Sequence, residues 1–216
     1  PEVAARFAGA FAGWLAARSG KAPRVAIARD GRKGGHSIHA AAIAGLTSAG
    51  CDVVDLGIAM TPTVGVAVDR LGASGGMVVT ASHNPQHWNG LKCLVTDGLR
   101  GVSAAAPTQT QASEIIAGFN SGAAPWCEWQ GVGGLDAYDR HAEDHVSVVC
   151  AALEEVFGQG PEHLGAGRGF VLDSVNASGI EGGRLMLEAL GCDEILHLGN
   201  QPSGLFPHTP EPIAEN

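Results

Sequence analysis

A serine loop followed by a lysine is the part of this sequence best suited to do chemistry. The loop spans residues 80–85, reads TASHNP, and follows a short apolar run that predicts a buried strand. Ser82 is therefore expected on a loop at the mouth of a strand, and this loop is stiffened by Pro85. Lys92 lies near the start of the next apolar run. A serine hydroxyl with an amine close by makes a usable nucleophile pair.

A charged segment follows the first predicted strand and is expected near the serine. Residues 29–32 read RDGR and come after the apolar run 24–28. Because ligands of α/β sheets bind beyond the carboxyl ends of the strands, Arg32 is expected at the same edge as Ser82. Its five donors suit a phosphate oxyanion. The alternative is a solvated surface turn, a common role of an Asp-Gly pair, and the nearby serine loop favours the functional interpretation.

The elements that position these residues follow from the alternation of apolar runs with helical stretches. Helices are expected at residues 2–18, 37–49, 61–71 and 108–119, and strands at 24–28, 52–56, 77–80 and 91–95. Thr61 is expected as the N-cap of its helix, with Pro62 at the first helical position. Residues 120–134 are expected to form a loop. The alternation predicts an α/β fold, a three-layer αβα domain with a mostly parallel mixed sheet.

A second, similar unit is expected after a Gly/Pro-rich boundary at residues 158–169. A helix at 138–157 leads out of the first domain. It is followed by a strand at 169–173, a helix at 180–190 and a strand at 194–198. The sequence therefore predicts one domain over residues 1–157 and the beginning of an incomplete second domain over residues 158–216.

Composition restricts the partners and the compartment. The net charge is −9 and no basic run occurs, so neither nucleic acid nor an anionic membrane surface is expected as a partner. No apolar stretch approaches the roughly 20 residues that span a bilayer. Five cysteines without a C-x-x-C pair predict reduced thiols, packed as small apolar groups in a cytoplasmic protein. No signal peptide is visible, although the first residue is Pro1.

Three further patterns resemble a hydrolase nucleophile, a dinucleotide-binding loop and a metal site, but each lacks the flanking elements or residues that such a site requires. Residues 72–76 match a G-x-S-x-G nucleophile elbow, but the helix is expected before them and the strand after them. The glycines at 165–169 precede a strand, which excludes a dinucleotide fingerprint. His141 and His145 have metal-ligand spacing on a predicted helix, but Ala142 stands where H-E-x-x-H needs glutamate, so a solvated helix face is expected.

The serine loop, together with NGLK at residues 89–92, resembles the active-site loop of the phosphohexomutases, the phosphoglucomutase/phosphomannomutase superfamily. Residues 29–32 resemble the family's G-R-D-x-R-x-S segment, although Ala28 replaces the glycine and Lys33-Gly34 stand where a serine or threonine is usual. The run from residue 204 to 216 resembles its F-P…P-x-P…E-N segment. The resemblance covers almost the whole chain and is to the N-terminal portion of these enzymes.

The resemblance implies interconversion of hexose 1-phosphate and hexose 6-phosphate through a phosphoserine enzyme and a bisphosphate intermediate. Ser82 would carry the phosphoryl group, with Lys92 as acid/base or charge-stabilising partner. Arg32 would stabilise phosphate charge, His83 would lie near the phosphate, and Asn84 would join Arg32 and Lys92 in binding it. The implied cofactors are Mg²⁺, held from this chain through the phosphate on Ser82, and a hexose 1,6-bisphosphate activator.

The family enzymes have four domains, of which this chain resembles the first and part of the second. A metal loop, D-G-D-x-D-R, is expected just beyond Asn216, and the sugar-recognition loop in later domains. The chain is therefore expected to be a fragment of a longer mutase, inactive alone, that acts on a phosphosugar with those later domains; its oligomeric state is not predicted. A glucose or mannose phosphate is the favoured substrate. Alternatives are a phosphoglucosamine mutase and a non-catalytic, truncated binding module of the same fold. The absence of a P-loop or a paired-Asp motif argues against an unrelated phosphatase or kinase.

Overall fold

The larger sheet of the computed structural model has the strand order β4-β3-β1-β2-β5. Its parallel strands are β1 (Arg24–Arg29), β2 (Asp52–Ile58), β3 (Gly75–Val79) and β5 (Leu135–Ala137), and β4 (Leu91–Val95) is antiparallel to β3. The structure describes residues 1–96, 103–122, 124–211 and 213–214. Pro212, Glu215 and Asn216, which contribute to the C-terminal motif, lie outside this description.

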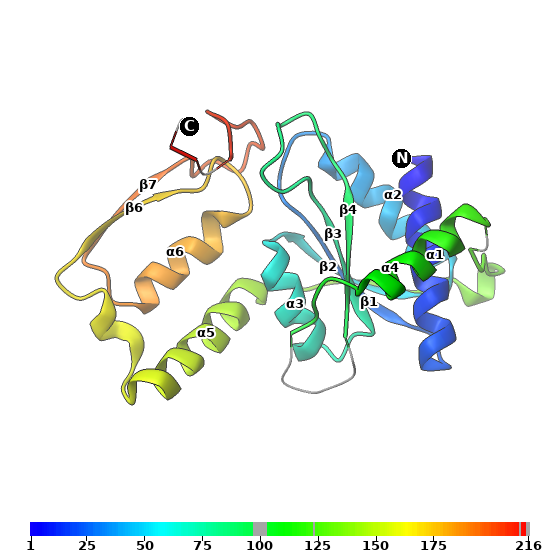
Figure 1. Ribbon diagram of the computed structural model, residues 1–216, viewed down its shortest axis with the longest axis horizontal. Coiled ribbons are helices and arrows are strands. Elements are labelled where there is room, and N and C mark those ends of the chain that lie inside the picture. The colour runs from blue at the N-terminus through cyan, green and yellow to red at the C-terminus, as the bar shows by residue number, and fades with distance from the viewer. Residues whose placement is uncertain (97–102, 123, 212, 215–216) are drawn as a thin grey trace.

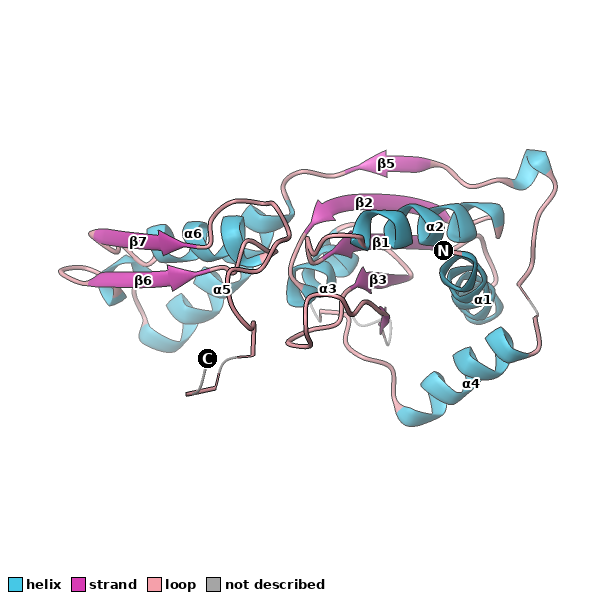
Figure 2. Cartoon of the chain, turned by 90° about the horizontal axis from the view of Figure 1, so that it is seen from above, coloured by secondary structure: helices cyan, strands magenta, loops and turns pink. Residues whose placement is uncertain are grey.

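Helices cover both faces of this sheet, as Figures 1 and 2 show. One face carries α1 (Glu2–Ser19), α2 (Gly35–Ser48) and α4 (Gln109–Asn120), and the other carries α3 (Thr61–Arg70) and α5 (His141–Phe157). Alternate residues of β1 enter the two cores: Val25 and Ile27 pack under α1 and α2, whereas Ala26 and Ala28 pack under α3. A strand buried on both faces reads as a continuous apolar run. The predicted α/β fold with a mostly parallel mixed sheet is confirmed.

The strand order brings the two motif segments to one point on the edge of the sheet. Arg29 of β1 is the register partner of Val79 of β3, so the residues after them leave the sheet side by side. The amide of Asp30 donates to the carbonyl oxygen of Val79 at 3.0 Å. This edge is where an α/β sheet places its ligands.

Some local predictions were wrong. Strand β5 was not expected. Among the described residues it pairs with β2 alone, and all three of its residues are exposed, so no apolar alternation marks it. Within the predicted loop 120–134, Trp129–Gly131 form a short 3-10 helix. The N-cap of α3 is the extended residue Met60, and Thr61 is already helical. The helix predicted from residue 138 starts at His141.

The two histidines of α5 do not form a solvated face, contrary to the prediction. His141 is only 7% exposed. His145 places Nδ1 2.9 Å from the hydroxyl of Thr63 in α3, and burial lowers its pKa. His145 therefore links α5 to α3, and His141 is buried at the start of the helix, which covers the α3 face of the sheet.

A smaller parallel sheet forms the second unit (Figure 1). It consists of β6 (Gly169–Asp173) and β7 (Glu194–Leu198), joined by α6 (Gly179–Ala189); a short 3-10 helix, Pro161–Leu164, precedes β6. The predicted strands and helix are therefore present within one residue of their expected bounds. Helix α5 contacts both α3 and α6 and so runs between the two units. The domain boundary after residue 157 stays a prediction.

Burial and helix length bear on two further expectations. All five cysteines are free; Cys51 and Cys93 are buried, and burial raises the pKa of each thiol to about 12. These two thiols therefore stay protonated and pack as apolar groups. Within the described residues, no helix combines the length and apolar character needed to cross a bilayer.

We expect Gly45→Ala to destabilise the first unit, because helices α1 and α2 touch at this residue. An added Cβ would overlap the carbonyl oxygen of Ala5. Overpacking of this closed contact should exceed the gain in helix propensity and lower the free energy of unfolding by about 2 kcal/mol. Denaturant titration measures the change. Gly118→Ala in α4 is the matched control, because its Cβ would enter open space; equal stability of both variants would contradict the prediction.

Candidate active site

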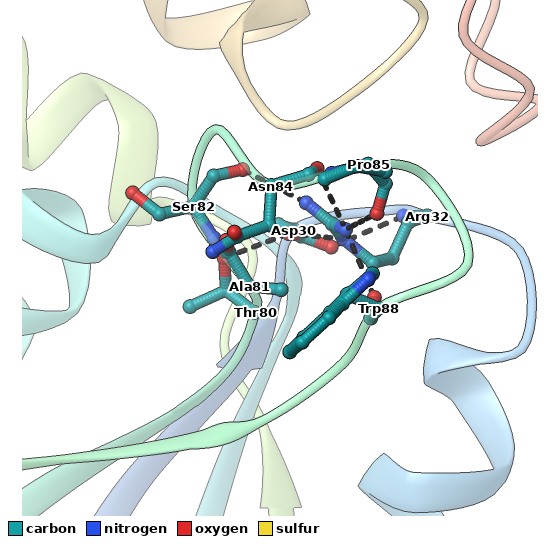
Figure 3. A network of polar contacts seen from close by, with 8 residues as sticks. All are labelled: Asp30, Arg32, Thr80, Ala81, Ser82, Asn84, Pro85 and Trp88. Carbon is teal, nitrogen blue, oxygen red and sulfur yellow. Dashed lines mark hydrogen bonds and ion pairs between the residues drawn. The ribbon is translucent and has the colours of Figure 1, made fainter. Parts of the chain in front are cut away.

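The serine loop is closed by hydrogen bonds within itself (Figure 3). The amide of Ser82 donates to Oγ1 of Thr80 at 2.9 Å, and Nδ2 of Asn84 donates to the carbonyl oxygen of Ala81 at 2.7 Å. Ser82 has a left-handed backbone, with φ of 57°. A non-glycine residue in this region signals a surrounding structure that holds it there. Ser82 is exposed, and its hydroxyl points away from Arg32.

Arg32 lies inside the loop rather than on its surface (Figure 3). Its side chain is 0% exposed. Nη2 donates to the carbonyl oxygen of Ser82 at 2.8 Å. Nη1 lies 3.4, 3.1 and 2.9 Å from three more carbonyl oxygens, those of Asn84, Pro85 and Trp88. The planar fork of an arginine suits such a set of acceptors. Arg32 therefore holds the backbone around Ser82, and its direct contact with a phosphate stays a prediction.

Asp30 and Thr80 connect Arg32 to the serine amide. Oδ2 of Asp30 accepts from Nε of Arg32 at 2.8 Å and from the hydroxyl of Thr80 at 2.7 Å. The Thr80 oxygen then accepts the Ser82 amide. The carboxylate thus orients the hydroxyl so that a lone pair faces Ser82. Sequence reasoning singled out neither residue for a role of its own, although both lie inside the matched RDGR and TASHNP motifs.

A pocket of about 320 Å³ lies between the two units. Ser82, His83 and Arg32 line it from the first unit, as do Asp30 and Thr80. The second unit contributes the end of β6 and the start of α6. The structure thus places three of the predicted site residues on one pocket at the carboxyl edges of both sheets. Asn84 is absent from its described lining, since its amide group closes the loop instead.

Lys92 lies on β4 and is exposed. It lines a larger, mostly apolar pocket of about 610 Å³ beside α4. The two pockets share Thr61 and Pro62 at the start of α3. Lys92 is not among the described residues that line the Ser82 pocket, and its action at the serine stays a prediction.

A charged pair lies at the second unit's side of the serine pocket. Oδ1 of Asp173 accepts the amide of Val175 at 2.9 Å, and Oδ2 lies 2.8 Å from Nε2 of His208. The Val175 amide and then His208 lower the pKa of Asp173, while Asp173 raises the pKa of the exposed His208. The ion pair is complete between these two values. It weakens as pH falls through the pKa of Asp173 or rises through that of His208.

The described part of the chain contains no cluster of three histidine, cysteine, aspartate or glutamate side chains that would hold a metal ion. A divalent cation such as Mg²⁺ prefers several oxygen ligands. These residues alone therefore do not fit a complete magnesium site.

Comparisons with known proteins agree with this geometry. A family model described as phosphoglucomutase/phosphomannomutase, alpha/beta/alpha domain I, matches residues 1–120. The chain is 34% identical over 220 residues to a probable phosphoglucosamine mutase of Methanopyrus kandleri, covering all of this chain and 43% of that protein. It is 33% identical over 218 residues to a phosphoglucomutase/phosphomannomutase of Thermococcus kodakarensis, covering all of this chain and 45% of that protein.

Solved structures show the same fold. A putative phosphomannomutase of Thermus thermophilus matches with a TM-score of 0.78 at 25% identity, over 99% of this chain and 45% of that one. A phosphoglucomutase/phosphomannomutase family protein of Burkholderia thailandensis matches with a TM-score of 0.71 at 29% identity, over 95% of this chain and 42% of that one. The chain thus spans less than half the length of these relatives. With its family-model match and the serine loop at the sheet edge, the chain belongs to the phosphoglucomutase/phosphomannomutase family and corresponds to its N-terminal portion.

Proposed function

We propose that this chain carries the catalytic serine of a phosphohexomutase that interconverts hexose 1-phosphate and hexose 6-phosphate. The observation that supports it most is the presentation of Ser82: the residue has a left-handed backbone on a loop whose carbonyl oxygens bind a buried arginine. Phosphoryl transfer depends mainly on positioning and on stabilising charge. A loop fixed in this way meets the first requirement.

The proposed reaction uses Ser82 twice. The phosphoserine transfers its phosphoryl group to a sugar hydroxyl: the P–O bond to Ser82 breaks, a P–O bond to the sugar oxygen forms, and the proton of the sugar hydroxyl passes through the acid/base partner to the Ser82 oxygen. The sugar bisphosphate then turns over, and its other phosphoryl group passes to the Ser82 oxygen: the sugar P–O bond breaks, and the proton of the Ser82 hydroxyl moves to the sugar oxygen that leaves. His83, on the same pocket, would lie near the phosphate, and Lys92 would act as acid/base or charge-stabilising partner. In this scheme hexose 1,6-bisphosphate is both intermediate and activator.

The proposal assigns this chain one ligand for Mg²⁺, and that ligand is the phosphoserine. The described side chains offer Mg²⁺ no carboxylate cluster. The phosphate on Ser82 is the ligand that we propose from this part of the chain. When bound there, the ion would neutralise charge on the transferring group.

Two sugar classes compete for the role of substrate. We propose a glucose or mannose phosphate, the substrates that one relative's name contains. Glucosamine phosphate is the second candidate, because several relatives are named as phosphoglucosamine mutases. The ratio of kcat/KM for glucose 1-phosphate and glucosamine 1-phosphate would separate them. A non-catalytic binding module of the same fold is the remaining alternative; the intact serine loop argues against it.

Phosphoryl labelling tests the proposal directly. Because the relatives are more than twice as long as this chain, the experiment uses the full-length protein that carries it. After incubation with glucose 1,6-bisphosphate, intact-mass analysis should show one added phosphoryl group, and peptide mapping should place it on Ser82. Ser37→Ala, which alters an exposed serine, should be labelled normally. Label on another residue that persists in Ser82→Ala would contradict the assignment.

A further inference from the structure

A segment of the second unit, residues 204–206, touches the Arg32 segment and the serine loop. Figure 1 shows this C-terminal part of the chain, in red, beside the loop that follows β3. The carbonyl oxygen of Gly204 accepts the amide of Lys33 at 3.1 Å. Gly204 is buried and has a φ of 65°, and a Cβ there would overlap the carbonyl oxygen of Gly31. The approach is therefore so close that it requires glycine.

Phe206 makes the two contacts that reach the site. Its ring centroid lies 5.2 Å from the guanidinium carbon of Arg32, within the range of a cation–π contact. Its amide donates to Oε1 of Gln86, the residue directly after the serine loop, at 3.0 Å. Arg32 is thus held by the loop carbonyls along its edge and by Phe206 over its face.

Asn176 attaches this segment to the second unit. Its carbonyl oxygen accepts the amide of Gly204 at 3.1 Å, and its Nδ2 donates to the carbonyl oxygen of Leu205 at 3.0 Å. Asn176 and its neighbour Val175 both have left-handed backbones, with φ of 57° and 46°. For a β-branched valine such a φ is an outlier that the surrounding structure must maintain. The surrounding structure therefore holds the turn after β6 in a strained backbone conformation, and in this conformation Asn176 hydrogen-bonds to Gly204 and Leu205.

We propose that residues 204–206 are a latch that couples the second unit to the serine loop, with Phe206 as a positioning residue. The contacts run from Asn176 through Gly204 and Phe206 to Arg32, and from Arg32 to the carbonyl oxygen of Ser82. Loss of the ring frees one face of Arg32 and loosens the backbone around Ser82. The effect on loop order stands on these contacts alone, whereas its catalytic consequence rests on the proposed mutase function.

Hydrogen exchange on the 216-residue chain tests the latch without any activity. Phe206→Ala should speed exchange of the Ser82, Asn84 and Trp88 amides roughly tenfold, the scale of a lost, partly desolvated cation–π contact. Amides of β1 and β3 should keep their rates. Leu205→Ala is the matched control, because that side chain is exposed and its backbone contact survives substitution. Phe206→Tyr keeps the ring and should restore slow exchange, whereas Phe206→Leu should not. Loop exchange in Phe206→Ala equal to that in Leu205→Ala, or equal acceleration in β1, would overturn the latch.

Steady-state kinetics of the full-length protein test the catalytic consequence. Phe206→Ala should lower kcat roughly tenfold, with KM nearly unchanged and with recovery in Phe206→Tyr. Turnover equal to that of Leu205→Ala would overturn the positioning role. A wild-type protein without mutase activity would refute the proposed function instead, and hydrogen exchange would still decide whether the latch exists.

Discussion

Ser82→Ala in the full-length protein is expected to lower kcat by roughly a thousandfold or more, the scale on which removal of a covalent nucleophile acts. Alanine has no oxygen that could accept or donate the phosphoryl group. The loop itself should survive, because its contacts at this residue are made by the backbone. The amide bonds to Thr80, and the carbonyl oxygen accepts from Arg32.

A coupled assay that follows hexose 6-phosphate from hexose 1-phosphate measures the loss. Thermal unfolding of the variant should match that of the wild-type protein, which separates lost chemistry from lost structure. Ser37→Ala, on the exposed start of α2, should retain full turnover. Substantial activity in Ser82→Ala would show that another group carries the phosphoryl group, and the phosphoserine mechanism would fail.

Arg32→Met should affect both stability and turnover. The free energy of unfolding is expected to fall by about 3–5 kcal/mol, the scale of breaking a buried ion pair from one side. Asp30, whose side chain is only 13% exposed, would lose its charged partner. Four carbonyl oxygens, three in the serine loop and that of Trp88 just after it, would also lose their donors. Misplacement of Ser82 by about 1 Å would lower kcat by roughly a hundredfold.

Denaturant titration and steady-state kinetics measure the two effects. Arg184→Met is the matched control for an ion pair, because Arg184 binds Glu188 on the exposed surface of α6. It should cost about 0.5 kcal/mol or less. Arg32→Lys keeps a charge for Asp30 but not the planar fork, so stability should partly recover while kcat stays low. A stable Arg32→Met variant with a raised KM alone would assign Arg32 to direct phosphate binding instead.

Local spacing in the sequence was enough to predict most elements and the position of the serine loop. Apolar runs of strand length alternate with helical stretches, and this order leaves few arrangements other than a parallel sheet covered by helices. The TASHNP loop follows such a run directly, so Ser82 had to lie at the end of a strand. Strand β5 escaped prediction because it is short, exposed and held by one neighbour, and nothing in its own residues marks the pairing.

The tertiary structure decided where the side chains of the site point. Arg32 and Ser82 are 50 residues apart, and the sequence placed them at one edge without saying that the guanidinium lies beneath the loop. The apposition of β1 and β3 puts Asp30 against Thr80, and the return of the chain at Gly204 puts Phe206 over Arg32. The tertiary structure also places Lys92 on the pocket beside α4 rather than on the pocket of Ser82. The physical reason is that residue spacing encodes the periodicity of elements, whereas hydrogen-bond partners depend on strand order and on contacts between units.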